Sequence, residues 1–496
     1  MKYDYIVIGA GVSGLTSAVI LAKNGFRVAL VEKSGKTGPL LRGFSKKGIF
    51  FDTGFHYAGN IGKGEIGDIF FRYLGFSDRL KKVPSNPECF DLIRFPDLQF
   101  EYRFPIGYDR IKEKLHNVFP HDKNAVDSYL YAIKGQCASL PYLNLDADFG
   151  SLEILKAVHG PSLKEFMDQL TNNELLKAVL SIHCLLNGVP AQEQALNNYA
   201  CIVGPYYESV HRVDGGGAAI IREFDTSLEK AGVDVFCGSS VKEISFSTAG
   251  SLNGVRLQDG TIMESKGCIS TVHPLHLLKI VSNSLFRPAY ISRLKSLEET
   301  PSAFILYGEC NPASDFLSGS SVYISPDTSA ASFNTDDPIE ERPFNISSTC
   351  TQNGNFIRSG IIAICPANLA ETRPWEDSVT GTRPEGYLKF KEEIAGRMLR
   401  HIESSCPELR GKIKPVDCST PLTMRDYANN PFGSMYGVKH KTEQYNPFPT
   451  TRLPGLLLAG QSIVAPGLLG AIISGFVACG NILGNDFLRR ELKKCS

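Results

Sequence analysis

Three glycines near the N-terminus have the spacing of a dinucleotide-binding turn. Gly9, Gly11 and Gly14 form a GxGxxG motif, with Val12 and Ser13 inside it. The first glycine permits a tight turn, the second lets a pyrophosphate approach the backbone, and the third lets a helix pack closely on a strand. The helix that begins there offers amide donors and the positive end of its dipole to the phosphates. The spacing therefore predicts a dinucleotide site.

The residues around the glycines supply the context that such a motif requires. Residues 5–8 are apolar and predict a strand, and residues 15–22 repeat apolar side chains at the spacing of one helix face. Residues 26–31 predict a second strand, which ends at Glu32. A carboxylate there accepts hydrogen bonds from ribose hydroxyls and disfavours the 2′-phosphate of NADP. The motif alone leaves FAD, NAD and an empty glycine-rich turn as alternatives.

Four side chains are candidates for proton transfer or for orienting a substrate. Residues 48–59 read GIFFDTGFHYAG and contain His56 and Tyr57; Tyr436 and His440 lie far along the chain. Histidine suits proton transfer near neutral pH. The structural alternatives are that His56 only bonds the backbone, that the tyrosines are cleft walls, and that His440 lies in a surface loop.

Composition excludes several classes of protein. The 496 residues carry 52 basic and 52 acidic side chains, so the net charge is zero, and we expect no nucleic-acid partner. The 13 cysteines are scattered and contain no CxxC pair. This pattern predicts no metal site and a reducing, cytoplasmic location.

The central part of the chain divides into stretches of different pattern. Residues 64–192 are mostly helical in pattern, with apolar clusters at 152–155 and 175–180. A helix is expected to open at 213–217 and to end near Lys230. Residues 233–271 then predict an antiparallel meander, because Asn-Gly at 253–254 and Asp-Gly at 259–260 are strong hairpin signals.

The C-terminal region has no charged residue between Arg452 and Asp486. Residues 456–459 predict a strand, which is followed by a glycine-rich turn and an apolar helix. Residues 464–483 are long enough to span a bilayer. Their glycines and Pro466 favour instead a helix buried in a globular core.

The order of these stretches predicts an α/β fold with interleaved domains. A Rossmann-type dinucleotide-binding domain is expected from residues 1–80, 205–275 and 415–496. An α+β substrate domain is expected from residues 81–204 and 276–414, which mix helices and strands. Cofactor and substrate would meet at the junction, where clefts commonly form.

Four pieces of the sequence resemble the phytoene desaturase-type flavin oxidoreductases related to carotenoids and retinoids, in particular the branch of retinol saturase and carotenoid isomerase. The pieces are residues 8–14 with Glu32, residues 51–59, residues 215–217 with 241–244, and residues 420–437 with 457–475. They follow the family order over nearly the whole chain. The resemblance implies FAD as cofactor and a reaction at a carbon–carbon bond of an apolar polyene or isoprenoid lipid.

The resemblance also implies where FAD lies. The cofactor-binding residues it implies are Gly9, Gly11, Val12, Ser13, Gly14, Glu32, Lys33, Arg42, Phe55, His56, Val241, Gly460, Gln461, Leu468 and Leu469. In this placement the ADP half is held by Gly9, Gly11, Ser13, Gly14 and Glu32. Lys33 and Val241 lie at the adenosine, and Phe55 and His56 approach the isoalloxazine. The pyrophosphate, ribityl chain and flavin ring lie near Gly460, Leu468 and Leu469. Two positions depart from the family pattern, since Gly38–Pro39 replaces a Gly-Gly pair and Gln461 replaces an acid.

Several functional alternatives remain open. A bound flavin carries the hydride, while the protein orients the substrate and supplies protons. Saturation and desaturation are both compatible with the residues, as are a non-redox carotenoid isomerase and an amine-oxidase-type flavoenzyme. Because Pro39 and Gln461 depart from the family pattern, a non-enzymatic carrier that no longer binds FAD is a further alternative.

The expected partners are an apolar small molecule and a membrane surface. A lipid-soluble substrate is collected at a membrane, so we expect peripheral contact. A short basic tail, residues 489–494, adds attraction to anionic lipid or is a solvated helix end. Apolar residues between 152 and 186 either form a substrate entrance or pack in the core. The sequence does not predict the oligomeric state.

Overall fold

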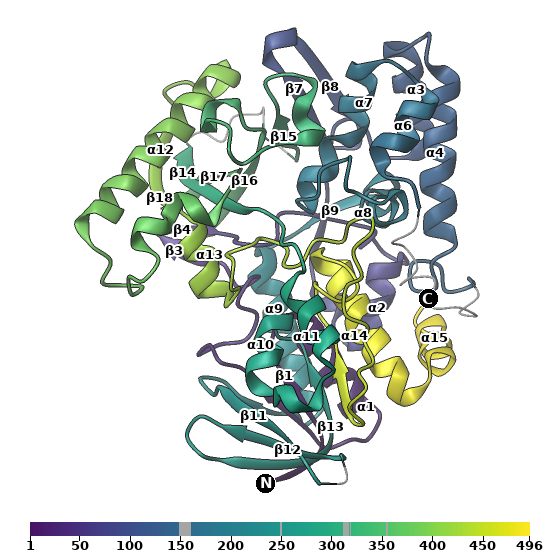
Figure 1. Cartoon of the computed structure of the whole chain (residues 1–496). Coiled ribbons are helices and arrows are strands. Elements are labelled where there is room, and N and C mark those ends of the chain that lie inside the picture. The colour runs from purple at the N-terminus through teal and green to yellow at the C-terminus, as the bar shows by residue number, and fades with distance from the viewer. Residues whose placement is uncertain (148–159, 249, 311–316, 318, 354–355) are drawn as a thin grey trace.

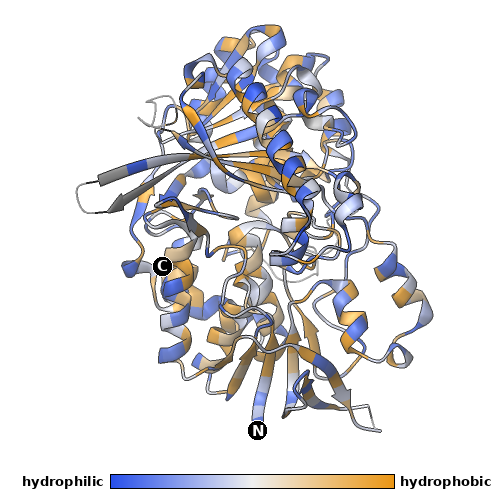
Figure 2. Cartoon of the chain, turned by 90° about the vertical axis from the view of Figure 1, so that its left-hand side faces the viewer, coloured by the Kyte–Doolittle hydropathy of each residue, from blue (hydrophilic) through white to orange (hydrophobic). Residues whose placement is uncertain are grey.

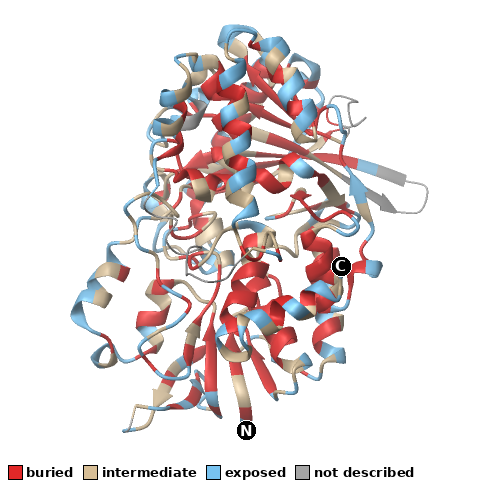
Figure 3. Cartoon of the chain, turned by 90° about the vertical axis from the view of Figure 1, so that its right-hand side faces the viewer, coloured by how far each residue is buried: buried red, intermediate tan, exposed pale blue. Residues whose placement is uncertain are grey.

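The computed structural model describes residues 1–147, 160–248, 250–310, 317, 319–353 and 356–496. Two seven-stranded sheets form the centres of two lobes, one above the other in Figure 1. Figure 3 shows the buried residues gathered in the strands of both sheets and in the helices packed against them. This arrangement confirms the predicted α/β fold with interleaved segments.

The first sheet carries the dinucleotide motif. Its strand order is β10-β2-β1-β13-β12-β11, and β19 pairs with β13. The strands are β1 (Lys2–Ile8), β2 (Val28–Val31), β10 (Asp234–Phe236), β11 (Val241–Phe246), β12 (Leu252–Leu257), β13 (Ile262–Ser270) and β19 (Leu456–Leu458). The pairings of β10, β2, β1, β13 and β19 are parallel, whereas β11 and β12 are antiparallel. The sheet therefore joins three distant parts of the sequence.

The predicted meander is present, with one turn misplaced. The Asp-Gly pair at 259–260 lies in the turn between β12 and β13, as predicted. The Asn-Gly pair at 253–254 is not a hairpin turn, because both residues lie inside β12. Gly254 is needed there for a different reason: it has a φ of +136°, and a side chain would strike the Met263 backbone of β13.

Helices cover both faces of the first sheet. One face packs against α1 (Val12–Lys23), α2 (Ile66–Leu74), α9 (Gly216–Lys230), α14 (Gly467–Leu483) and α15 (Asn485–Lys493). The other face packs against α10 (Pro274–Ile280) and α11 (Pro288–Lys295). Gly475 lets α14 lie close to α1, since a Cβ there would be 2.8 Å from Cγ2 of Thr16. The predicted apolar C-terminal helix is thus a core helix.

None of the helices in the described parts of the chain is both long and apolar enough to cross a bilayer.

The second sheet forms the other lobe. Its strand order is β18-β14-β17-β16-β15-β7-β8. The strands are β7 (Asp91–Phe95), β8 (Phe100–Phe104), β14 (Ser302–Cys310), β15 (Ser321–Ile324), β16 (Phe344–Asn353), β17 (Phe356–Ala367) and β18 (Ile413–Ser419). Their pairings are antiparallel except for β15 with β7. Figure 2 shows hydrophobic residues along the strands of both sheets.

Helices also cover the second sheet. A group of five lies near β7 and β8: α3 (Tyr108–Val118), α4 (Lys123–Ala138), α6 (Leu163–Leu170), α7 (Glu174–Ser181) and α8 (Leu196–Glu208). The long helix α12 (Glu385–Ser405) packs against the β14–β17 side of the sheet. Residues 175–180 are helical as predicted, whereas the cluster at 152–155 lies outside the described residues.

The prediction of a mostly helical stretch over residues 64–192 missed three strands. The hairpin of β7 and β8 turns through η2 (Pro96–Leu98), and β6 (Lys82–Pro84) precedes it. Strands β7 and β8 have only five residues each, too short to show a clear period among the surrounding helices.

Short elements connect the lobes. β3 (Phe44–Lys46) pairs with β4 (Ile49–Phe51), and a three-stranded sheet contains β5 (Ala58–Gly59), β9 (Val210–Val213) and β6. Helix α13 (Pro421–Ala428) precedes the last crossing between the lobes. The remaining turns of 3-10 helix are η1 (Ser77–Arg79), η3 (Ile182–Leu186), η4 (Asn283–Leu285), η6 (Thr328–Ser332), η7 (Ile339–Glu341), η8 (Leu369–Trp375) and η9 (Pro407–Leu409).

The packing of α10 and α11 bears on the expected domain boundaries. Leu277 and Leu294 are buried in the core that also contains Ile6 and Ile8 of the first sheet. We therefore propose that the second insertion begins near residue 300, where β14 starts, rather than at residue 276.

Candidate active site

A large cavity lies between the two lobes. Its volume is about 1080 Å³, and its walls include Ile8 and Gly9 at the end of β1 as well as Tyr323 and Ile364 of the second sheet. Small-molecule sites commonly measure roughly 300–1,000 Å³. The cavity therefore has room for a cofactor together with a second ligand.

The glycine motif forms an open cradle at one end of this cavity. Gly9 has a φ of +96°, and side chains at Gly9 or Gly14 would overlap Thr271 or the Gly9 carbonyl. A Cβ on Gly11, by contrast, would meet no described atom within 4 Å, and Gly11 is the N-cap residue of α1. The first amides of a helix have no partner within the helix. The end of α1 is thus shaped to receive phosphates.

Glu32 is held rigidly at the cavity wall beside this cradle. It follows β2, and its side chain is largely buried. Oε2 accepts a hydrogen bond of 2.7 Å from the Ala10 amide, and Oε1 accepts one of 2.7 Å from the Ser34 amide. Oε1 also accepts a hydrogen bond of 2.8 Å from the Ser34 hydroxyl, whereas Oε2 retains a further lone pair. The carboxylate therefore fits the ribose hydroxyls of an adenosine.

Most of the predicted cofactor residues line the cavity. These are Gly9, Gly11, Val12, Ser13, Glu32, Lys33, Phe55, His56, Val241, Gly460, Gln461, Leu468 and Leu469. Gly14 packs behind the cradle.

Arg42 differs from its prediction, because it does not line the cavity and its Nη1 donates a 2.9 Å hydrogen bond to the Lys36 carbonyl. Pro39 lines the cavity, and the Gly38 amide donates to the Ala10 carbonyl at 2.9 Å, which holds this segment against the glycine turn.

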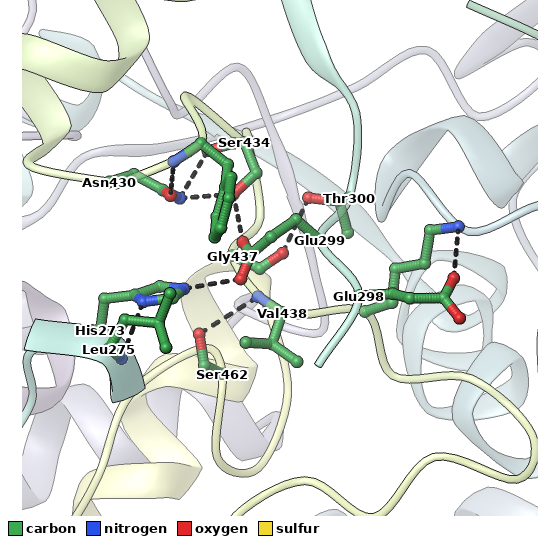
Figure 4. A network of polar contacts seen from close by, with 12 residues as sticks. His273, Leu275, Glu298, Glu299, Thr300, Asn430, Ser434, Gly437, Val438 and Ser462 are labelled. Atoms are coloured by element: carbon green, nitrogen blue, oxygen red, sulfur yellow. Dashed lines mark hydrogen bonds and ion pairs between the residues drawn. The ribbon is translucent and has the colours of Figure 1, made fainter. Parts of the chain in front are cut away.

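Residues 430–440 form a loop, here called the strap, that carries Tyr436 along the cavity wall. Figure 4 shows a buried anchor at its beginning, where Glu299 bonds His273 and Ser434. The Ser434 hydroxyl donates to Oε2 of Glu299 at 2.7 Å, and Oε1 lies 2.7 Å from Nε2 of His273. Asn430 donates to the Ser434 carbonyl at 2.9 Å. The anchor ties the strap to the end of β13 and to the start of the second lobe.

Thr300 and Ser462 fasten the middle of the strap. The Thr300 hydroxyl accepts from the Tyr436 amide at 3.1 Å, and the Thr300 amide donates to the Gly437 carbonyl at 2.9 Å. The Ser462 hydroxyl accepts from the Val438 amide at 3.3 Å. These bonds position the Tyr436 ring at the cavity.

His440, a predicted proton-transfer residue, has both ring nitrogens engaged. Its Nε2 lies 2.6 Å from the Gln461 carbonyl, and its Nδ1 lies 3.3 Å from the Asn446 amide nitrogen. Burial also lowers the pKa of His440. A neutral ring with an Nε2–H donor satisfies both contacts, so the side chain positions Gln461 and has no nitrogen free for a substrate.

His56 lines the cavity but is neutral near neutral pH. Burial and the positive charge of Arg212 lower the pKa of His56 to about 4. The ring can therefore act through an N–H or a lone pair, and not as an imidazolium acid.

Tyrosine hydroxyls supply the remaining polar groups on the second-lobe side. Tyr57, Tyr206, Tyr323 and Tyr436 all line the cavity. Burial raises the pKa of each, that of Tyr436 to about 12, so all four are protonated near neutral pH. Tyr206 and Tyr323 were not predicted, because α8 and β15 reach the cavity only through long-range packing.

A buried carboxylate next to Tyr57 was also missed. Asp91 is fully buried, and its oxygens lie 3.0 and 3.1 Å from the Tyr57 hydroxyl. Nε2 of His183 is 3.0 Å from Asp91, and the Tyr323 hydroxyl is 2.8 Å from that of Tyr57. An aspartate at the start of a short apolar strand gives no sequence signal of this kind.

The described residues contain no group of histidine, cysteine, aspartate or glutamate side chains arranged to hold a metal ion.

Comparisons with known proteins agree with this geometry. The model of the family described as flavin containing amine oxidoreductase matches residues 12–338. The human all-trans-retinol 13,14-reductase is 26% identical over 99% of this chain and 87% of its own. The chloroplastic prolycopene isomerase of Arabidopsis thaliana is 22% identical over 98% of this chain and 83% of its own.

Solved structures share the fold. An oxidoreductase from Methanosarcina mazei has a TM-score of 0.64 at 16% identity and covers 96% of this chain and 99% of its own. Putrescine oxidase, solved with putrescine bound, has a TM-score of 0.65 at 14% identity and covers 97% of this chain and 99% of its own.

The family match extends over more than half of the residues and includes residues 12–14 at the end of the glycine motif, Glu32 and the segment with His56. The cradle at α1 accepts phosphates and Glu32 accepts a ribose, so the residues present fit FAD. The chain is therefore an FAD-dependent oxidoreductase and belongs to the flavin-containing amine oxidoreductase family.

Proposed function

We propose that this enzyme transfers hydrogen at a carbon–carbon double bond of an apolar polyene or isoprenoid lipid. The observation that carries the proposal is the wall of the cavity beyond the dinucleotide cradle. Its apolar members include Leu140, Leu143, Leu185, Leu186, Ile202, Ile305, Ile364, Met424 and Met435. Neutral tyrosine hydroxyls provide the polar groups among them. A wall of this kind favours an apolar, uncharged substrate.

The relatives support the same substrate class. The human relative is named for reduction of all-trans-retinol, and the Arabidopsis relative for isomerisation of prolycopene. Both names refer to conjugated isoprenoids. Because the identities are low, the particular polyene is left to experiment.

In this proposal, some residues of the chain bind the cofactor and the substrate, and others supply protons. Bound FAD supplies or accepts hydride when it is present. The amides at Gly11 and the carboxylate of Glu32 hold its phosphates and ribose. The apolar wall excludes water from the substrate, and Tyr57 and Tyr436, which line the cavity, are the candidate proton donors. His56 offers a neutral imidazole on the same wall.

The direction of transfer is tested by product mass. The holoenzyme is reduced anaerobically with dithionite and mixed with all-trans-retinol, with lycopene isomers and with phytoene. We expect a gain of two hydrogens in one of them. A loss of two hydrogens by the oxidised enzyme would instead show a desaturase. If no polyene changes in mass or geometry, the proposal is wrong.

Isomerisation is the second candidate function. The similarity to prolycopene isomerase favours it, and it needs the same apolar cavity. A product of unchanged mass and altered double-bond geometry would establish it in place of net reduction.

Amine oxidation fits the cavity less well, although amine oxidases share the fold. Glu32 and Asp426 are the carboxylates among the described lining residues. The Glu32 oxygens bond the Ala10 and Ser34 amides, and Asp426 is paired with Arg383 and Arg425. A cationic amine would have no unengaged carboxylate to pair with, and burying an unpaired charge is costly. Release of peroxide with an amine would contradict this argument.

We also propose peripheral contact with a membrane in the cytoplasm, because the substrate dissolves in lipid. The basic tail contributes little to it. Arg489 donates to the Leu145 carbonyl at 2.6 Å, Lys493 pairs with Asp146 at 2.7 Å, and Lys494 pairs with Glu491 at 2.5 Å. Flotation with neutral and anionic liposomes tests the contact, and equal recovery without lipid would contradict it.

A further inference from the structure

Asp91 and His183 lie beside Tyr57 and have no role in the binding of cofactor or substrate described above. Together with Tyr57 and Tyr323 they form a hydrogen-bonded group that is here called the Asp91 cluster. We propose that the Asp91 cluster is a proton relay, in which Asp91 resupplies the Tyr57 hydroxyl as that hydroxyl protonates the substrate. This inference rests on the proposed function, because it assigns the source of the proton for reduction of a double bond.

The geometry gives Tyr57 the position of the last donor. Tyr57 is only half-buried and lines the cavity, whereas Asp91 is fully buried and does not line it. The Tyr57 oxygen lies 3.0 Å from Oδ1 of Asp91 and 2.8 Å from the Tyr323 hydroxyl. When the Tyr57 hydroxyl gives its proton to a group in the cavity, the remaining Tyr57 oxygen therefore still has two hydrogen-bonding neighbours.

Burial shifts Asp91 toward its protonated form. The carboxyl is 0% exposed, and desolvation raises the pKa of Asp91 although His183 and Tyr57 bond it. A buried carboxyl favours its neutral form unless it is fully paired. The hydrogen bond to Tyr57 gives this proton an exit toward the cavity.

His183 and Arg212 can hold the carboxylate that remains after the transfer. Nε2 of His183 is 3.0 Å from Oδ2 of Asp91. Arg212 places a positive charge near Asp91 and Tyr57, while its guanidinium donates to the carbonyls of Ser348 and Ser320 at 3.1 and 2.9 Å. Both stabilise a negative charge that appears only during the reaction.

One observation argues against a purely structural role. Nδ1 of His183 is buried and has no hydrogen-bond partner among the described residues. Buried polar atoms are nearly always bonded, so an exception calls for an explanation. A ring kept solely to stabilise the fold would be expected to use both nitrogens. His183 instead packs against Phe90 and Phe104 and directs one nitrogen at Asp91.

The proposed step is balanced as follows. Reduced FAD, when bound, would supply the hydride for the new C–H bond at one alkene carbon. The Tyr57 O–H bond breaks, and its proton forms a C–H bond at the neighbouring carbon. The Asp91 O–H bond breaks in turn, and its proton passes to the Tyr57 oxygen. Asp91 is left as a carboxylate beside His183 and recovers a proton from solvent before the next turnover.

The first test is spectroscopic and needs no turnover. Infrared spectra of the FAD-loaded protein at pH 7 are compared for wild type and Asp91→Asn. We expect the variant to lose a carboxylic-acid C=O band, and Tyr57→Phe to shift that band by removing its hydrogen bond. Tyr129→Phe is the matched control, because Tyr129 is also buried and its hydroxyl bonds that of Tyr207 at 2.9 Å, away from Asp91. It should leave the band in place.

The second test follows proton transfer itself. Dithionite-reduced holoenzyme is mixed with the polyene substrate in H₂O and in D₂O. Asp91→Asn should slow product formation by about 10²-fold, the range of general acid catalysis, with FAD content unchanged. His183→Gln should slow it less and shift the pH profile, since His183 acts through Asp91.

The outcomes separate the relay from the proposed function. If no band is lost in Asp91→Asn, Asp91 is ionised and the relay is overturned. If Asp91→Asn retains the wild-type rate and pH profile, the relay is overturned while the reductase stands. If the wild type reduces no polyene but the band responds as expected, the proposed function fails and the infrared result still supports a protonated Asp91 coupled to Tyr57.

Discussion

At the scale of single residues, burial decides what each titratable group of this cavity can do. His56 lines the cavity, but its pKa of about 4 means that the imidazole is neutral near neutral pH. Asp52, four residues earlier, shows the opposite effect. It is half-buried and accepts a 2.8 Å hydrogen bond from the Gly217 amide at the start of α9, and desolvation raises the pKa of Asp52 to about 6.

Asp52→Asn should therefore change stability in a pH-dependent way. A raised pKa means that the folded state favours the protonated carboxyl. The stabilisation is complete below about pH 4 and is lost as the pH rises through 6. The asparagine oxygen can still accept from Gly217. Above pH 7 we expect the variant to gain about 1–3 kcal/mol in free energy of unfolding relative to wild type, at roughly 1.4 kcal/mol per unit.

Urea denaturation of the holoenzyme between pH 4 and pH 8 measures this difference. A gain that is the same at every pH would contradict the assignment to Asp52 ionisation.

Glu32 and Arg42 make a matched pair for cofactor binding. Removal of the Glu32 carboxylate deletes the expected ribose contact and two bonds that hold the turn, so Glu32→Ala should weaken FAD binding by at least about 10-fold, as for a hydrogen bond to a charged group. Arg42→Ala should leave the affinity unchanged, because Arg42 does not line the cavity and its guanidinium bonds the Lys36 carbonyl. Titration of apoprotein with FAD, followed by flavin fluorescence, measures both. Equal losses in the two variants would place Arg42 at the cofactor after all.

At the scale of elements, the strap shows how a loop without regular structure is held in one conformation. Its bonds run to the end of β13 through His273, to the start of β14 through Glu299 and Thr300, and to the segment after β19 through Ser462. Three elements from distant parts of the chain thus position Tyr436. Loops that are fixed in this way commonly carry functional residues.

Glu299→Gln tests the anchor of the strap. The variant keeps the shape but removes the charge that bonds His273 and Ser434, both buried partners. We expect a loss of about 1–3 kcal/mol in free energy of unfolding and a lower kcat/KM, because Tyr436 becomes less well positioned. Glu298→Gln is the control. Its side chain is 52% exposed and pairs with Lys441 at 2.6 Å, so the loss should stay below about 1 kcal/mol.

Urea denaturation and steady-state turnover measure the two effects. Similar losses in both variants would mean that the buried anchor has no special role in holding the strap.

At the scale of the whole molecule, the cofactor end of the cavity is assembled from segments that are not adjacent in sequence. The cradle comes from residues 9–14, the adenosine wall from Val241 and its neighbours, and the opposite wall from Gly460 to Leu469. FAD that spans them links the N-terminal, central and C-terminal parts of the first lobe. Its binding energy is therefore expected to stabilise the entire lobe.

Removal of FAD should lower the stability of the folded protein by mass action. At a free FAD concentration 100 times the Kd, the stabilisation amounts to about 2.7 kcal/mol. Thermal unfolding of apoprotein with increasing FAD should show a Tm that rises steadily, and Glu32→Ala should need more FAD for the same rise. A Tm that is independent of FAD would contradict a cofactor bound across the lobe.

Local sequence determined the dinucleotide cradle, the expected meander from β11 to β13 and the buried C-terminal helix. These features depend on neighbouring residues: a glycine turn acts through backbone conformation, and a helix or strand shows its period within a few turns. The misplaced hairpin at 253–254 marks the limit of such reasoning, since Gly254 is required by contact with β13 rather than by a turn.

Only the tertiary structure decided the chemistry of the second half of the cavity. Tyr57 is separated from Tyr323 by 266 positions, and Asp91 from His183 by 92, yet their polar atoms lie within hydrogen-bonding distance. Pairing of β15 with β7 and packing of η3 against both bring them together. Burial then sets their protonation, because desolvation depends on everything that surrounds a side chain. The sequence by itself therefore predicted the dinucleotide cradle, and the packing of the two lobes decided which polar groups lie together on the other side of the cavity.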